Sequence, residues 1–146
     1  MSDKDAIMPR VAESFAKQKV METLGATLVS ATDGRVEIAL PFNPDFTQQH
    51  GFLHAGTVAT VLDSACGYAG FSVMPEDAAV LTAEFKINLL APADGQSFHF
   101  VGEVVKPGRT LVIAQGTAFA EKDGKEKAIA IMTATLAVVQ GRGLSG

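Results

Sequence analysis

The chain of 146 residues has one cysteine, and it has no run of lysine or arginine. A single cysteine cannot form an internal disulfide, so the fold must be held by its apolar core. This cysteine, Cys66, lies in an apolar stretch where a small thiol packs well, and we interpret it as a core residue rather than a nucleophile. With no basic cluster and a formal charge of -4, DNA or RNA is not an expected partner.

Two further features are missing, and both concern location. Residues 1–11, MSDKDAIMPRV, are charged and lack the apolar core and small-residue cleavage site of a signal peptide. The most apolar segment, 55–69, contains Asp63 and is shorter than the roughly 18 clean apolar residues that suggest a membrane helix. We therefore expect a cytoplasmic protein with no membrane partner.

The chain is rich in apolar residues, which make up 47% of it against 19% charged residues. A mean hydropathy of +0.22 is high for a soluble protein of 15.3 kDa, so we expect apolar surface to be buried between subunits. The length fits one domain, 1–146. Residues 1–8 and 141–146 are expected to be disordered tails.

The stretch 48–73, QQHGFLHAGTVATVLDSACGYAGFSV, is the most unusual part of the sequence. From residue 55 onward nearly every side chain in it is small or apolar, which predicts a buried helix. Asp63 is the only charge there, and burial should raise its pKa. A carboxylate in such a place is either used in chemistry or is structural, held by a hydroxyl such as that of Thr60 or Thr82.

The remaining segments alternate between helical and strand patterns. Residues 8–23 have helical spacing and predict one amphipathic helix. Two alternating runs, 26–31 and 35–40, are joined by an Asp-Gly turn and predict a hairpin. Four strand-like runs follow the long helix, at 81–89, 98–104, 110–120 and 128–139. This order predicts an α+β architecture, the hotdog fold, in which an antiparallel sheet of about six strands wraps one long buried helix.

The start of the long helix, His54-Ala55-Gly56, is a second candidate site. The first N–H groups of a helix have no partner inside it, and the positive end of the helix dipole favours an oxyanion. The alternative is an ordinary helix start with a small residue for packing. His50 and His54 have no further ligands at metal-site spacing, so we predict no metal site. Ser64 lies mid-helix, without the G-x-S-x-G turn of a nucleophilic serine.

One run of this sequence resembles the signature of PaaI-type hotdog-fold acyl-CoA thioesterases. The run is Gln48-x-x-Gly51-x-x-His54-Ala55-Gly56-(x)6-Asp63. The similarity covers about residues 24–139, including the Leu90-Ala91-Pro92-Ala93 end of one strand and the Gly108-Arg109-Thr110 turn. The sequence departs from the usual pattern twice. Gln48 stands where the family has asparagine, and Ala55 replaces the first glycine.

The resemblance implies that the protein hydrolyses an acyl- or aryl-CoA thioester. It gives Asp63 the role of general base or nucleophile. It makes the backbone N–H of Ala55 the oxyanion donor, with Gly56 beside it. His54 would orient the loop and the thioester carbonyl.

The same resemblance implies roles for two further residues. Gln48 would hold the water or the acid, and Thr82 would lie near the acid. Acid and oxyanion donor come from opposite subunits in the family, so a homodimer or a homotetramer is expected. The resemblance implies no cofactor, since coenzyme A is part of the substrate.

The phosphates of coenzyme A require local cations in a net-acidic protein. Arg109 and Lys106 are the predicted contacts, in a set of turn cations that also includes Lys122 and Lys125. Each of these could instead be a solvated surface charge.

Two other functions stay open at this point. One is a hydratase or dehydratase acting on acyl thioesters, although the loop pattern of such enzymes is not seen. The other is a noncatalytic acyl-CoA-binding or regulatory module in which Asp63 is structural. The acyl group is not indicated, because it depends on how residues such as Phe52, Tyr68 and Phe71 pack across subunits.

Overall fold

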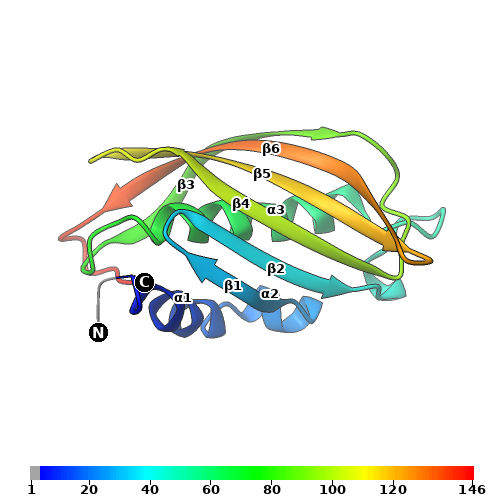
Figure 1. The fold of residues 1–146 in the computed structure, drawn as a ribbon, viewed down its shortest axis with the longest axis horizontal. Coiled ribbons are helices and arrows are strands. Elements are labelled where there is room, and N and C mark those ends of the chain that lie inside the picture. Colours follow the sequence, from blue (N-terminus) through cyan, green and yellow to red (C-terminus); the bar gives the residue numbers. More distant parts are fainter. Residues whose placement is uncertain (1–3) are drawn as a thin grey trace.

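The computed structural model describes residues 4–146 and shows one antiparallel sheet curved around a central helix (Figure 1). The helices are α1 (Ile7–Ala16), α2 (Lys19–Leu24), the short 3₁₀ helix η1 (Pro44–Phe46) and α3 (Ala55–Phe71). The strands are β1 (Thr27–Thr32), β2 (Arg35–Pro41), β3 (Ala79–Leu89), β4 (Ser97–Lys106), β5 (Leu111–Lys122) and β6 (Lys125–Val139). They lie in the order β1-β2-β4-β5-β6-β3, and the predicted hotdog arrangement is confirmed.

Two glycines allow α3 to lie directly on the sheet. Gly102 of β4 and Gly116 of β5 are register partners beneath the helix. A Cβ atom on Gly102 would overlap the backbone carbonyl of Ala65, and one on Gly116 would lie 2.7 Å from the sulfur of Cys66. Because neither position has a side chain, the helix backbone packs closely against the sheet. This contact fixes the height and position of α3, and therefore of every side chain along it.

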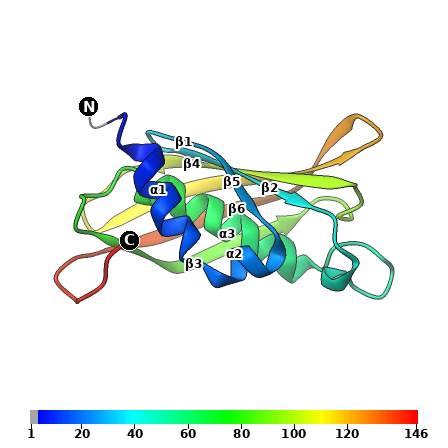
Figure 2. The ribbon, with the colours of Figure 1, turned by 90° about the horizontal axis from the view of Figure 1, so that it is seen from below.

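The prediction of one amphipathic helix over residues 8–23 is wrong in one respect, because the structure has two helices there. Gln18 has an extended backbone, with φ -79° and ψ 101°, and α2 begins after it. Figures 1 and 2 show α1 and α2 running beside β1. Side chains of α1 reach α3, and Arg10 donates hydrogen bonds to the carbonyls of Phe71 and Met74 at its C-terminal end. The N-terminal segment therefore covers α3 outside the sheet.

The structure describes most of the two segments predicted to be tails, 1–8 and 141–146. Ile7 and Met8 belong to α1, while residues 1–3 of the predicted N-terminal tail lie outside the described residues. Residues 141–146 form neither helix nor strand, but the chain turns back so that Lys17 Nζ donates to the carbonyl of Gly146 at 3.0 Å. No helix among residues 4–146 has the length and apolar character needed to cross a membrane.

The strand β3 lies at one edge of the sheet, where it pairs with β6 and with no other strand of residues 4–146. The alternation of apolar and polar residues from Leu81 to Leu89 is the pattern of a strand with one dry face. Instead Leu81, Phe85 and Leu89 are 52%, 43% and 55% exposed. Nothing within residues 4–146 covers them, so this edge strand exposes apolar side chains. Such an edge is a ready surface for pairing with another chain.

Candidate active site

Asp63 and Thr82 come together where the middle of α3 faces β3. The hydroxyl of Thr82 donates to Oδ1 of Asp63 at 2.9 Å. The other hydroxyl considered from the sequence, that of Thr60, donates to the carbonyl of Gly56 instead. Burial raises the pKa of Asp63 above its ordinary value, while the Thr82 hydrogen bond opposes this to a smaller extent. A half-buried carboxylate with a raised pKa is a better base near neutral pH than an exposed one.

The Asp63 carboxylate opens onto a cavity of about 600 Å³. One wall is β3, from Ala79 to Thr82, and the opposite wall comes from the junction of α1 and α2. At that junction the hydroxyl of Ser14 donates to the Tyr68 hydroxyl at 3.2 Å, and the hydroxyl of Ser64 donates to Oε1 of Gln18 at 3.1 Å. The sequence pattern gave no sign of this polar wall, because it depends on the break between the two helices.

At the N-terminus of α3, not every backbone N–H group is free to bind a ligand. His54 caps the helix, and its Nδ1 accepts a hydrogen bond of 2.8 Å from the N–H of Gly56. The N–H of Gly56, which was expected to lie beside the oxyanion donor, is therefore already engaged within the chain. Ala55 is exposed, and no acceptor for its N–H is found within residues 4–146. Since Nδ1 of His54 accepts, the neutral ring has its proton on Nε2, where it can donate to a ligand.

Gln48 lies beside this helix start rather than beside Asp63. Its Oε1 accepts a hydrogen bond from the backbone N–H of His50. Together with His54 and Ala55 it lines a second cavity of about 600 Å³. The rest of this cavity is mostly apolar, with Phe52, Leu53, Val58, Leu89, Leu90, Ala91, Pro92, Ala93 and Ile129. Within one chain, Gln48 thus belongs to the helix start and does not hold the acid.

Ala55 and Asp63 are eight residues apart on the same helix. At 1.5 Å of rise per residue they are separated by about 12 Å along the axis. One thioester carbonyl cannot contact both. The candidate site in a protomer therefore consists of two halves, a donor half formed by Gln48, His54 and Ala55, and an acid half formed by Asp63 and Thr82.

Cys66 lies one turn from Asp63 and is fully buried. Burial, together with the nearby carboxylate of Asp63, raises the pKa of its thiol to about 12. A thiol that stays protonated at neutral pH is not a nucleophile, so the interpretation of Cys66 as a core residue is confirmed. Within residues 4–146, no three side chains of His, Cys, Asp or Glu are grouped to hold a metal ion.

The two cations predicted to contact coenzyme A lie far from the helix start. Lys106 ends β4 and Arg109 lies in the turn before β5, and both are exposed. That end of the sheet meets the C-terminal end of α3, where the N–H of Val104 donates to the carbonyl of Gly34 and the N–H of Gly34 donates to Ser72 Oγ. Within one chain, these cations are therefore at the opposite end of α3 from Ala55.

Comparison with known proteins assigns the chain to a family. Residues 50–127 match the family described as the Thioesterase superfamily. A protein of Saccharolobus solfataricus that bears the name of a putative esterase is 31% identical over 123 residues, covering 83% of this chain and 86% of its own length.

Two solved structures share the fold. A thioesterase family protein from Silicibacter pomeroyi is 61% identical, with a TM-score of 0.90 over 90% of this chain and 97% of its own. The PaaI protein of E. coli, from the phenylacetic acid degradation operon, is 16% identical, with a TM-score of 0.86 over 96% of this chain and 98% of its own. The chain belongs to the thioesterase superfamily and has the hotdog fold that it shares with PaaI.

Proposed function

We propose that the protein hydrolyses an acyl- or aryl-CoA thioester at a site shared by two copies of the chain. Membership of the thioesterase superfamily supports hydrolysis of a thioester. The observation that carries the proposal is the pair of half sites on α3, one with the Asp63 carboxylate and one with the open N–H of Ala55. One half supplies the carboxylate that acts as the base, and the other supplies the N–H donor for the oxyanion.

The chemistry follows from the two halves. Ionised Asp63 takes a proton from a water molecule, whose oxygen attacks the carbonyl carbon of the thioester. The negative charge that develops on the carbonyl oxygen is stabilised by the N–H of Ala55, at the positive end of the α3 dipole. The C–S bond then breaks, and the thiolate of coenzyme A leaves and gains a proton. Water and substrate suffice, so no cofactor is needed.

A second route uses the same groups. Asp63 attacks the carbonyl carbon directly, coenzyme A leaves as the thiolate, and water opens the resulting anhydride. In both routes Thr82 holds the carboxylate in one orientation through its 2.9 Å hydrogen bond. Nε2 of His54, one residue from Ala55, donates a second hydrogen bond to the carbonyl oxygen in this proposal, since Nδ1 is taken by Gly56.

The open edge of β3 supports assembly into a homodimer. A second copy that added its β3 there would cover Phe85 and Leu89, which share the inner face of the sheet with their partners Ala134 and Ala130. Two-fold symmetry about that edge runs the two α3 helices antiparallel. Asp63 of one copy would then face Ala55 of the second copy. Dimers could pair further into a homotetramer, and the cytoplasmic location predicted from the sequence belongs to the same proposal.

The test is release of free thiol from a panel of acyl- and aryl-CoA thioesters. Thiol release that depends on the protein supports the proposal. A change in enoyl absorbance without thiol release would instead indicate a hydratase or dehydratase. Tight binding of acyl-CoA with no turnover would indicate a noncatalytic binding module.

A further inference from the structure

A third cavity, of about 470 Å³, adjoins the cavity at the start of α3. Phe52 and Pro92 line both. Three lysines line the new cavity, Lys122, Lys125 and Lys127, at the turn between β5 and β6. The apolar cavity at Ala55 therefore adjoins a cavity whose lining includes three lysines and two aspartates, Asp94 and Asp123.

The strand register explains why these lysines gather on one side. Lys122 is opposite Lys125, and Ala120 is opposite Lys127. Opposed residues of antiparallel strands project to the same face of the sheet. The acidic neighbours Glu121 and Glu126 also oppose each other, on the other face, where Glu126 lies 3.0 Å from Nε2 of His99. The three lysines therefore share one face of the sheet, and Glu121 and Glu126 share the other.

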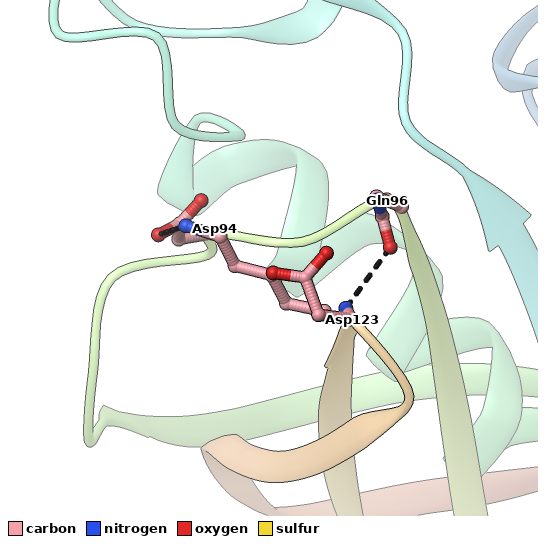
Figure 3. A network of polar contacts seen from close by, with 4 residues as sticks. Asp94, Gln96 and Asp123 are labelled. Atoms are coloured by element: carbon pink, nitrogen blue, oxygen red, sulfur yellow. Dashed lines mark hydrogen bonds and ion pairs between the residues drawn. The ribbon is translucent and has the colours of Figure 1, made fainter.

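The three lysines differ in whether an acidic side chain already pairs with them. Lys122 Nζ lies 2.7 Å from Oδ2 of Asp94, and this hydrogen-bonded ion pair raises the pKa of Lys122. Figure 3 shows the neighbouring contact, in which the backbone N–H of Asp123 donates to Oε1 of Gln96 at 3.1 Å. Both contacts tie the turn to the segment before β4.

Lys125 and Lys127 have no ion-pair partner within residues 4–146. The carboxylate of Asp123 also lines the cavity, so it offsets one of the two charges. Like charges placed on the same face of a two-stranded ribbon repel each other. Such a cost is expected where a ligand of opposite charge binds.

We propose that Lys125 and Lys127 bind the phosphate groups of coenzyme A, with the Asp94–Lys122 pair holding the turn in place. The inference rests on the proposed function, because the thioester carbonyl at Ala55 fixes one end of the ligand. The pantetheine arm then follows Phe52 and Pro92 to the lysines, where the ammonium groups form charge-assisted hydrogen bonds with the phosphates.

The test compares coenzyme A with pantetheine, which has the same arm and thiol but no phosphate. Binding of each is measured by calorimetry for the wild type and for the double variant Lys125→Ala/Lys127→Ala. We expect the variant to weaken coenzyme A binding by about tenfold or more, as for loss of hydrogen bonds to charged groups, and to leave pantetheine binding unchanged. The matched control, Lys106→Ala/Arg109→Ala, should bind both ligands as the wild type does.

Equal weakening of both ligands in the lysine variant, or no weakening of either, would overturn the inference. So would a loss of coenzyme A binding in the control alone. Failure of the proposed function has a different signature. In that case no acyl-CoA is hydrolysed by the wild type, while the difference between coenzyme A and pantetheine binding still reports on the lysines.

Discussion

The hydroxyl of Thr82 donates a 2.9 Å hydrogen bond to the carboxylate of Asp63, which joins the open edge strand β3 to the middle of α3. The acid is thus positioned by an element whose outer side is uncovered in the protomer. Any chain that pairs with β3 is brought next to Asp63. In the proposed shared site, this one hydrogen bond therefore connects assembly with chemistry.

Replacing Asp63 with asparagine should remove most of the activity and leave the fold intact. Asparagine keeps the shape and can still accept from Thr82, but it cannot take a proton from water. We expect turnover in thiol release to fall by about a hundredfold or more, the range typical of loss of a general base. A folded Asp63→Asn protein with unchanged turnover would remove Asp63 from the mechanism.

Thr82→Val should move the acid side of the pH–rate profile to higher pH. The Thr82 hydrogen bond lowers the pKa of Asp63 against the larger effect of burial, so its loss raises that pKa further. The carboxylate of Asp63 then ionises only at a higher pH. The matched control is Thr60→Val, because the Thr60 hydroxyl bonds to Gly56 and not to Asp63. A shift of equal size in both variants would contradict the assignment.

Asp63→Asn should also make the folded protein more stable at neutral pH. Burial raises the folded-state pKa of Asp63 above 3.8, so ionisation favours the unfolded chain. The wild type therefore loses stability as pH rises from about 3.8 through the folded-state pKa. Urea unfolding of both proteins at pH 7 and pH 4 measures this. We expect the variant to be more stable at pH 7, with a smaller difference at pH 4, whereas a difference independent of pH would contradict the cause.

Gly116→Ala should destabilise the fold by pushing α3 away from the sheet. The added methyl would lie 2.7 Å from the sulfur of Cys66, and such overpacking typically costs about 1–3 kcal/mol. Gly67→Ala is the control, since it adds the same methyl to α3 where no atom of residues 4–146 lies within 4 Å apart from the adjoining residues and the helix's own backbone. Thermal unfolding should show a lower midpoint for Gly116→Ala only. Equal midpoints would show that the sheet can adjust to the methyl.

The sequence predicted the elements whose patterns are local. The apolar run with Asp63 predicted α3, and the Asp-Gly turn predicted the β1–β2 hairpin, because period and turn chemistry are visible within a few residues. The break at Gln18 was not visible, since the helical spacing continues across it. The polar wall at Ser14 and Gln18 was not predicted either, because it depends on this break.

The site was predictable in its residue types and less so in its contacts. That Thr82, rather than Thr60, meets Asp63 depends on how β3 lies against α3, which no local pattern reveals. The engagement of Gly56 by His54 depends on a side-chain rotamer. The exposed apolar residues of β3 fit the alternating pattern, which marks an apolar face and carries no information on which chain covers it.

Mixing two inactive variants tests the shared site most directly. Ala55→Pro removes the proposed oxyanion donor, and proline suits this first helical position because His54 before it has φ -60° and ψ 140°. Asp63→Asn removes the acid. Each variant alone should be nearly inactive.

After subunit exchange of equal amounts, a mixed dimer has one site with both an intact Asp63 and an intact Ala55 N–H. We expect thiol release to recover to about a quarter of the wild-type rate, since about half the dimers are mixed and each has one of its two sites restored. If the two folded variants exchange subunits and activity does not return, the acid and the oxyanion donor come from the same chain, and the account is contradicted.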